Sequence, residues 1–497
     1  APPSGADRAA APRLAGAAAA VAAMAAVALP AKVALSGGLT QASAPSPLRR
    51  GARTAPRAQP SAGAWALPDR GPGDGAPPAH GRPEAAALAL GGLLGSAAAA
   101  RRHLRRQAAQ TTRKAQEVSS GAAADGKKTV IITGASSGLG LATTISLAKG
   151  GDWHVIMAVK DFAKGETVAK EAGLSDDSYT VMHCDLASNN SVRQFAKSFR
   201  MLGRPLDVLV CNAAVYFPNA DKKGALLPGL WAGGGPRWSA DGHELSFAAN
   251  YLGHFLLVNL LLPDLQASSA KPARCVILGT VTASVNEKDV GGMIPPVADV
   301  GDFGGLEMGM KKPVAMVDGK EFIGAKAYKD SKVCCVMLMR ELHKRYHEST
   351  GIVFSSLYPG CITDTGLFRE HYPAFRVFWP LLMKKVVKSY VSNEEAGSRL
   401  AKCVADPDYA VSGSYFSWGG ESGTGGSGGV DASQNKEKSS DVFGQEGSFR
   451  TLAVDEIGGQ AGWDGGGEKL FNLSEELVGL TAAEKEARVL RKESQAA

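Results

Sequence analysis

The sequence predicts an α/β fold in which helices cover both faces of a doubly wound parallel sheet. Short apolar runs rich in β-branched residues alternate with helical patterns from residue 128 to residue 358. A glycine-rich stretch stands between the first of these runs and the helical pattern that follows it. The helical patterns supply the crossovers that parallel strands require. Ligands of such a sheet bind at the carboxyl ends of its strands.

The elements can be predicted in chain order. Each predicted strand is a short apolar run, and each predicted helix is a longer run with helical periodicity. Strands are expected at 128–133, 153–159, 179–185, 207–212, 273–278 and 353–358. Helices are expected up to about 149, at 162–172, 191–202 and 242–266, from Tyr328 to about 347, and at 473–480. The stretches 221–238, 284–324 and 419–467 are longer than ordinary loops. Together the elements predict a single Rossmann-like domain with loop insertions.

The first 120 residues differ in composition from the rest. They carry 15 Lys and Arg against 5 Asp and Glu, a net charge of +10, and have few aromatic or β-branched residues. Such a segment buries too little apolar surface to offset the entropy of ordering it. An apolar run at 14–31, an Arg- and Pro-rich stretch, a second apolar run at 85–100 and an Arg cluster at 101–106 follow one another. That order resembles the plastid-targeting leaders, or transit peptides, of algae with complex plastids, and a disordered low-complexity tail is the alternative.

The remaining residues suggest one domain with two appended parts. We expect 1–120 to be a leader that is disordered or removed, 121–418 the Rossmann-type domain, 419–467 a Gly/Ser-rich insert, and 468–497 a C-terminal helical segment. Residues 121–497 have a net charge of −3 and no basic patch interleaved with aromatic residues, so no nucleic-acid partner is expected. Seven cysteines without paired CxxC spacing argue against a disulfide framework and against a metal site.

The glycine-rich stretch predicts a dinucleotide site. Glycines at this junction let the backbone approach a pyrophosphate, and the following helix directs its N–H groups toward the phosphate oxygens. The two serines add hydroxyl donors. The candidate contacts are Gly134, Ser136, Ser137, Gly138, Leu139 and Gly140.

The residue that ends the second strand selects the cofactor. Lys160 and Lys164 favour the 2′-phosphate of NADPH, whereas the neighbouring Asp161 opposes that choice. Lys164 could equally lie on a solvated helix face. After the third strand, Asp185 and Leu186 are placed to contact the adenine.

The fourth strand ends in the small residues expected beside a nicotinamide ribose. Asn212, Ala213 and Ala214 would let the ribose lie close to the backbone. Asn212 could alternatively cap a loop, since Asn is common there.

Tyr328 and Lys332 are the candidate proton-transfer pair. On a helix, positions i and i+4 share one face, and a nearby ammonium should lower the pKa of the phenol. Thr280, or Thr282 as its competitor, follows the fifth strand and could donate a hydroxyl near the substrate. Asn250 lies within an apolar helix and must be hydrogen-bonded there, either as part of a proton relay or as a satisfied core amide.

His254 is expected to be a packed or capping histidine. The aromatic residues after residue 361 could form an apolar surface for a flat ligand, a part of the core, or an exposed interaction patch. With three lysines at 384, 385 and 388, this region could also meet an anionic membrane surface.

The glycine loop, Asn212, Asn250, Thr280 and the Tyr328/Lys332 pair resemble the short-chain dehydrogenase/reductase family. Further segments resemble the light-dependent protochlorophyllide reductases within it. These segments are Tyr328-Lys-Asp-Ser-Lys-Val-Cys334, Leu357-Tyr-Pro-Gly-Cys361, Thr365-Gly-Leu-Phe-Arg-Glu-His371, Tyr390-Val-Ser-Asn-Glu-Glu-Ala-Gly397, Ser417-Trp418 and the segment before Tyr328 that contains Ile294-Pro-Pro296. The resemblance covers residues 128–480 apart from the inserts.

The resemblance implies a light-driven step of chlorophyll biosynthesis in the plastid. NADPH would reduce the ring D double bond of protochlorophyllide, with Tyr328 donating or relaying the proton. Cys361 matches the active-site cysteine of the family, with a small buried hydrophobe as the alternative. The family also implies peripheral association with thylakoid-type membranes and homo-oligomers. Lys160 stands where the family usually has Arg, and Tyr251 where it usually has His.

Two other functions remain open from the residues alone. One is a light-independent NADP-dependent reductase that acts on an apolar carbonyl compound, and the other is a non-catalytic NADP(H)-binding scaffold. The Cys361 segment and the long stretch before Tyr328 argue against the first. The complete set of Asn250, Thr280, Tyr328 and Lys332 argues against the second.

Overall fold

The computed structural model describes residues 126–218, 235–279, 296–360, 362–363, 365–371, 373–382, 391–417, 439–440, 446–447, 450–452 and 460–488. The expected leader, 1–120, lies outside these ranges, as does most of the expected insert at 419–467.

One sheet holds the described part of the chain together. Its strand order is β10-β7-β6-β5-β4-β1-β2-β3. All neighbouring pairs are parallel except β10–β7. The strands are β1 (Lys128–Thr133), β2 (Trp153–Val159), β3 (Tyr179–His183), β4 (Val208–Cys211), β5 (Arg274–Leu278), β6 (Val353–Tyr358), β7 (Ser414–Ser417) and β10 (Arg450–Leu452). Because β1 lies between β2 and β4, the strand order reverses there, and such a switch point opens a crevice for a ligand.

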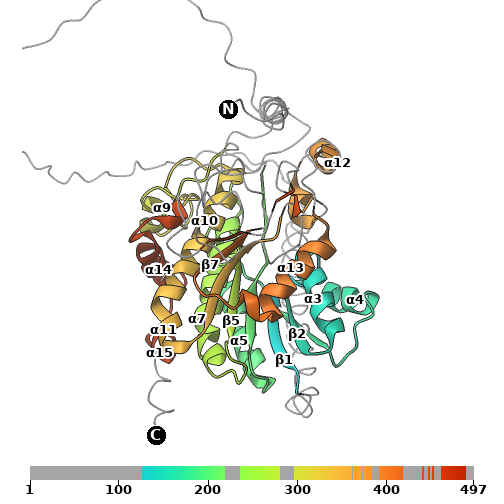
Figure 1. Cartoon of the computed structure of the whole chain (residues 1–497). Helices are drawn as coiled ribbons and strands as arrows, with labels where there is room; N and C mark the ends of the chain where they lie inside the picture. The colour runs from blue at the N-terminus through green and yellow to red at the C-terminus, as the bar shows by residue number, and fades with distance from the viewer. Residues whose placement is uncertain are drawn as a thin grey trace, which may run out of the picture. The chain divides into compact units, whose positions relative to one another are not determined.

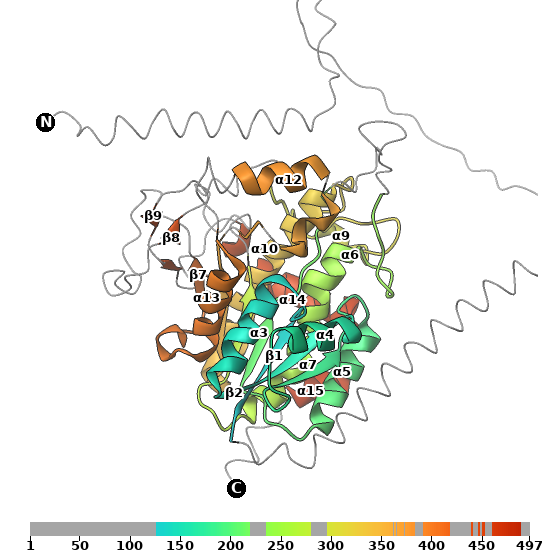
Figure 2. The same ribbon diagram turned by 90° about the vertical axis from the view of Figure 1, so that its right-hand side faces the viewer.

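Helices cover both faces of this sheet, as expected (Figures 1 and 2). Alternate residues of β1 enter two separate cores: Ile131 packs into one, and Val130 and Ile132 pack into the other. The larger core includes residues of α5 (Asn189–Met201), α7 (Gly253–Gln266), α10 (Gly324–Leu342) and α14 (Gly466–Leu477). The second includes residues of α3 (Gly138–Gly150), α4 (Phe162–Glu171) and α13 (Asn393–Ala405). The predicted doubly wound fold is confirmed.

The helix expected at 242–266 is interrupted. It consists of α6 (Leu245–Phe247), a π-helical turn η1 (Ala248–Leu252) and α7. The span Leu245–Gln266 is apolar and long enough to cross a membrane by composition, but 94% of its most apolar window is buried inside the protein. It is therefore a core helix, and the polar residues on it must find partners within the fold.

Several elements were not predicted. Strand β7 and helix α13 follow the Tyr328 region, and β10 from the expected insert adds an antiparallel edge to the sheet. The C-terminal helix begins earlier than expected, at Gly466, and α15 (Ala482–Ala487) follows it. The smaller elements are α9 (Gly304–Glu307), η3 (His343–His347), α11 (Glu348–Thr350), η4 (Gly366–Glu370), α12 (Pro373–Leu382), η6 (Pro407–Tyr409), η8 (Gln460–Gly462) and the hairpin of β8 (Ser439–Ser440) and β9 (Glu446–Gly447).

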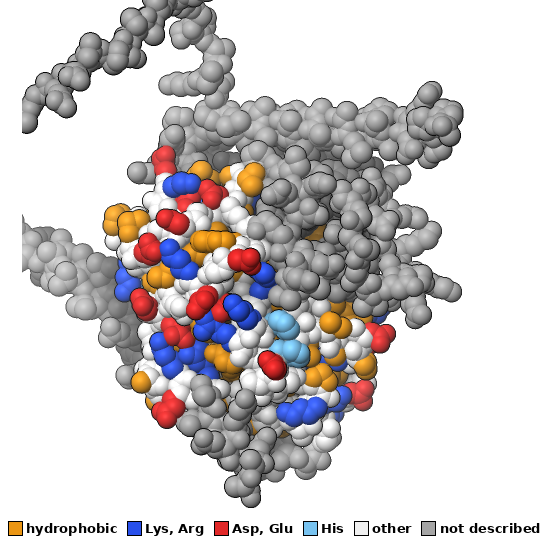
Figure 3. Space-filling model, turned by 60° about the vertical axis from the view of Figure 1, so that its left-hand side comes forward, with side chains coloured by type: hydrophobic (Ala, Val, Ile, Leu, Met, Phe, Trp, Pro, Cys, Tyr) orange, Lys and Arg blue, Asp and Glu red, His pale blue; other side chains and the backbone are white. Residues whose placement is uncertain are grey.

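Charged side chains fasten the described part of the long stretch before Tyr328, residues 296–323, to α10. The Lys326 ammonium pairs with Asp330 at 2.6 Å and with Asp318 at 3.0 Å. It also donates to the carbonyl of Asp299, and the Asp299 N–H donates to Asp330 at 2.8 Å. Lys326 and Asp330 are buried, so 296–323 and α10 are joined here by buried ion pairs rather than by apolar side chains. Elsewhere acidic and basic side chains are interspersed, as on the face shown in Figure 3.

Candidate active site

The glycine loop joins β1 to α3 and is shaped by close backbone contacts. Gly134 and Gly138 have φ of +68° and +52°, a region that favours glycine. A Cβ added at Gly140 would lie 2.6 Å from the Gly134 carbonyl oxygen and 2.6 Å from the Asn212 side chain. The Ser137 side chain makes no capping hydrogen bond to α3. The loop is thus a cradle that side chains would fill, and this fits a bound pyrophosphate.

The residues expected to select the cofactor lie together. The Lys160 ammonium pairs with the Asp185 carboxylate at 3.0 Å. The carboxylate of Asp161 instead accepts the Lys164 N–H at 3.0 Å and caps α4. The Asp161 charge therefore serves the helix N-terminus. Asp185 holds Lys160, whose side chain is 72% exposed, at the carboxyl end of β2.

The Thr133 hydroxyl organises the end of β1. It accepts the N–H groups of Asn212 at 2.9 Å and Ala213 at 3.0 Å, and it lies 2.9 Å from His254 Nε2. His254 Nδ1 lies 2.8 Å from the Asn250 carbonyl, which can only accept, so Nδ1 carries the proton and Nε2 accepts from Thr133. Burial lowers the pKa of His254 to about 4, which keeps the ring neutral. The expectation of a packed histidine is confirmed.

Asn212 is fixed by its neighbours. Its side-chain amide donates to the Thr133 carbonyl at 2.8 Å, and this places Asn212, Ala213 and the glycine loop side by side at the switch point. Leu186 is equally constrained, because a Cβ at Gly253 would lie 2.2 Å from its carbonyl oxygen. The predicted nucleotide-facing residues after three strands are therefore brought to one edge.

Asn250 is fully hydrogen-bonded and lies in the π-helical turn. Its side chain accepts the Val215 N–H at 2.8 Å and donates to the Val215 carbonyl and the Ser331 hydroxyl, both at 3.0 Å. Ser331 in turn donates to the Tyr328 carbonyl at 2.6 Å. Asn250 thus joins the loop after β4 to the turn of α10 that carries Tyr328. π-Helical turns are frequent at functional sites because they reposition single side chains.

The expected electrostatic relation between Tyr328 and Lys332 is wrong. Burial, followed by the neighbouring Tyr216 and Cys335, raises the pKa of Tyr328 above its usual value. Lys332 does share a helix face with Tyr328, but its ammonium donates to the Leu278 carbonyl at 2.9 Å. Burial lowers the pKa of Lys332. The spacing of Tyr328 and Lys332 predicts that the two side chains lie close together. It does not predict how deeply they are buried, and burial is what shifts their pKa values.

An aromatic cluster that the sequence did not reveal surrounds the phenol. The Tyr216 ring lies 4.7 Å from that of Tyr328, 6.2 Å from Phe368 and 6.3 Å from His371, centroid to centroid. Burial raises the pKa of Tyr216 to about 12 and lowers that of His371 to about 4, so both rings are neutral near pH 7. A single signal was available: Tyr216 follows directly after Asn212-Ala-Ala-Val at a strand end.

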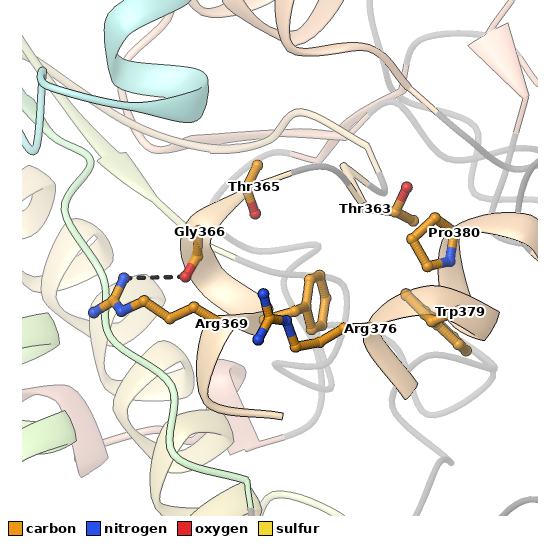
Figure 4. A pocket seen from close by; sticks show the side chains of 8 residues that line it. Thr363, Thr365, Gly366, Arg369, Arg376, Trp379 and Pro380 are labelled. Carbon is orange, nitrogen blue, oxygen red and sulfur yellow. Dashed lines mark hydrogen bonds between the residues drawn. The ribbon is translucent and has the colours of Figure 1, made fainter. Parts of the chain in front are cut away.

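A pocket of about 280 Å³ adjoins this cluster (Figure 4). It is lined by Thr363, Thr365, Gly366, Phe368, Arg369, Arg376, Trp379 and Pro380. Thr365 also borders the glycine loop, since a Cβ at Gly138 would lie 3.4 Å from the Thr365 methyl group. The pocket therefore joins the nucleotide edge and the aromatic cluster.

Thr280, Thr282 and Cys361 lie outside the described residues, so their places in the site stay predictions. The six cysteines within the described ranges are buried and free. Among those same residues, no group of three or more potential ligands is arranged to hold a metal ion. What the fold does assemble is a nucleotide cradle, a buried phenol and an aromatic wall.

Comparisons with known proteins agree with this arrangement. The family model described as short chain dehydrogenase matches residues 128–289. The chloroplastic protochlorophyllide reductase of Chlamydomonas reinhardtii is 46% identical over 355 residues, which are 71% of this chain and 79% of the relative. That of Cucumis sativus is 49% identical over 353 residues, 71% and 78% of the two chains. Protochlorophyllide reductase A of Arabidopsis thaliana is 54% identical over 291 residues, 58% and 68%.

These identities extend over most of each relative. The chain belongs to the protochlorophyllide reductase family of the short-chain dehydrogenases.

Proposed function

We propose that this protein is a plastid enzyme that uses NADPH and light to reduce the ring D double bond of protochlorophyllide to chlorophyllide. The observation that carries the proposal is the hydrogen-bonded chain of Asn250 and Ser331, which joins the loop after β4, next to the proposed nicotinamide edge, to the backbone of Tyr328. Relatives of 46% and 49% identity carry the name of this activity. The alternative, a light-independent reductase of an apolar carbonyl, is not favoured.

The residues of the chain fit NADPH. Gly134, Gly138 and Gly140 form a cradle without side chains, and Ser136 and Ser137 border it with hydroxyl groups. When bound, NADPH supplies the hydride. Lys160 would meet the 2′-phosphate, with Asp185 holding its ammonium in place. Lys164, Leu139, Leu186 and the Asn212-Ala-Ala214 segment complete the proposed set.

Tyr328 supplies the proton in this proposal. A raised pKa keeps the phenol protonated at neutral pH, so the hydroxyl is poised as a donor. Lys332 would then act by holding the nicotinamide ribose rather than by ionising Tyr328. Thr280 and Cys361 complete the proposed catalytic set on the strength of the family resemblance.

Peripheral membrane contact is proposed for α12. Its Val377 and Leu381 side chains are 68% and 48% exposed, and Arg376 is exposed beside them. Exposed apolar side chains on a short helix suit insertion into a headgroup region. Homo-oligomerisation is proposed from the resemblance alone. The leader at 1–120 is proposed to direct the chain to the plastid.

The direct test mixes the full chain with NADPH and protochlorophyllide in darkness and records absorption before and after brief illumination. A red-shifted chlorophyllide band that appears only after light, and only with NADPH, is expected. Conversion in darkness would favour the carbonyl reductase class. Bound pigment that stays unchanged in light would contradict the proposed activity.

A further inference from the structure

We propose that Arg369 and Arg376 form a subsite for the carboxylate of the pigment, and that this subsite sets which pigments the enzyme accepts. The inference rests on the proposed function, because the free propionic acid side chain of protochlorophyllide is the anion in question. The pocket described above supplies the geometry.

Two arginines line this pocket, and among the described residues that line it none is acidic. Arg369 comes from η4 and Arg376 from α12, so the two charges arrive from separate elements (Figure 4). Arg369 donates to the Gly366 carbonyl at 3.0 Å, and this contact fixes the direction of its side chain. Within the described ranges neither guanidinium forms an ion pair.

The carboxylate nearest in sequence is already neutralised. Glu370 follows Arg369 directly, yet its carboxylate pairs with Arg237 at 2.9 Å. The Arg237 guanidinium in turn lies over the Phe217 ring, 4.3 Å from its centroid. This contact restricts the rotation of the Arg237 side chain. Glu370 therefore does not cancel the charge of the pocket. Thr363 and Thr365 add hydroxyl groups, which suit a carboxylate as second donors.

The pocket shares Phe368 with the aromatic cluster beside Tyr328. Phe368 lines it, and its ring lies 6.2 Å from that of Tyr216, which lies 4.7 Å from Tyr328. The propionic acid arm of protochlorophyllide is attached to ring D, at the double bond that is reduced. A macrocycle that rests on this cluster with its acid arm on the Phe368 side would direct its carboxylate toward the pocket.

Size points to a substituent rather than to a whole ligand. The volume of about 280 Å³ lies below the range of roughly 300–1,000 Å³ that drug-sized ligands occupy. A short acid arm fits within this volume. An anion here could also come from a cofactor phosphate, because Thr365 borders the glycine loop. The two sources share the same charge and are separated by the experiment.

The test compares protochlorophyllide with its primary propionic amide, which has nearly the same shape and no charge. Dissociation constants of both pigments are measured in darkness on the full chain with NADPH, by pigment fluorescence. The wild type is compared with Arg369→Gln, Arg376→Gln and the conservative Arg369→Lys. Lys344→Gln, at an exposed lysine of η3, is the charge-matched control.

The wild type should bind the acid roughly tenfold or more tightly than the amide, since charge-assisted hydrogen bonds are the strong ones. Each Gln variant should bring this ratio toward one by weakening the acid alone, Arg369→Lys should restore part of it, and the control should retain it. Equal weakening of both pigments, or a wild-type ratio near one, would overturn the subsite. A raised dissociation constant for NADPH with an unchanged pigment ratio would assign the anion to the cofactor and also overturn it.

The proposed function can fail separately. If light converts neither pigment but the acid-to-amide ratio holds and depends on the arginines, the subsite stands and the photochemical assignment does not. If a Gln variant does not fold, the wild-type ratio and the Arg369→Lys variant still decide the question.

Discussion

Tyr328 combines a buried phenol with a network that fixes its backbone. Its raised pKa means that the donor form persists through neutral and mildly alkaline pH. Tyr328→Phe should therefore lower the yield per flash by roughly 100-fold or more while pigment binding is retained. The wild-type yield should show no loss from ionisation of this phenol between about pH 6 and about pH 9. Flash photolysis across that range measures both quantities.

The control for this change is Tyr346→Phe, which removes one hydroxyl in η3, beyond the turn that carries Tyr328. A Tyr328→Phe protein with normal yield would exclude the phenol as the proton source. A wild-type yield that falls with an apparent pKa near 8 would point to a group other than the phenol, since burial lowers the pKa of the neighbouring Lys329 to about 8.

The sequence predicts the single residues of the site unevenly. Spacing within one helix placed Tyr328 beside Lys332, and strand ends placed Asn212 and Asp185. Ser331 and Tyr216 were missed because their roles arise from contacts between distant segments. The Asn250 amide reaches Ser331 across 81 positions of sequence, and no local pattern records that distance.

At the scale of elements, the junction of β1 and α3 depends on the absence of a side chain. Gly140→Ala would place a methyl group 2.6 Å from the Gly134 carbonyl, so the loop must shift away from its cradle form. We expect NADPH to bind at least tenfold more weakly, measured by quenching of protein fluorescence. Gly150→Ala lies in the same helix with nothing within 4 Å of its added Cβ.

That matched variant should bind NADPH like the wild type. Equal affinity of both variants would mean that the glycine loop is not the phosphate cradle. Equal weakening of both would point to a general effect on α3.

Elements with strong periodicity were predicted closely. The bounds of β2 and β6 agree with the expected 153–159 and 353–358. The sequence predicts one continuous helix at 242–266, because apolar composition does not reveal a π-helical turn. Helix α13 carried visible signals, with Ser392 as its cap and Glu394 and Glu395 in its first turn. Strand β10 has three residues and pairs with β7. A strand this short carries no sequence pattern that predicts such a pairing.

Across the described molecule, the C-terminal helix α14 contributes buried side chains to the larger core. Phe471 of α14 is 1% exposed and packs edge-on against Phe255 of α7, with ring centroids 4.9 Å apart. Its ring also lies 4.2 Å from the Arg345 guanidinium. Phe471→Ala should lower the free energy of unfolding by roughly 3–5 kcal/mol, measured by chemical denaturation.

Val411→Ala, at a side chain that is 41% exposed, should change it by less than about 0.5 kcal/mol. A small effect at Phe471 would mean that α14 can leave without opening the core. Activity in the Phe471→Ala protein should fall with the folded fraction, because the Phe471 ring packs against Phe255, Arg345 and Arg488.

The buried network of Lys326, Asp318 and Asp330 makes the two sides of the active site respond differently to ionic strength. Dissolved ions screen exposed charges and hardly reach buried ones. The Lys326 and Asp330 side chains are 10% and 0% exposed, whereas that of Lys160 at the nucleotide edge is 72% exposed. Added salt should therefore weaken the interaction of Lys160 with the cofactor phosphate. It should have little effect on the ion pairs that hold α10, the helix that carries Tyr328. Cofactor occupancy would therefore vary with ionic strength while the catalytic geometry stays constant.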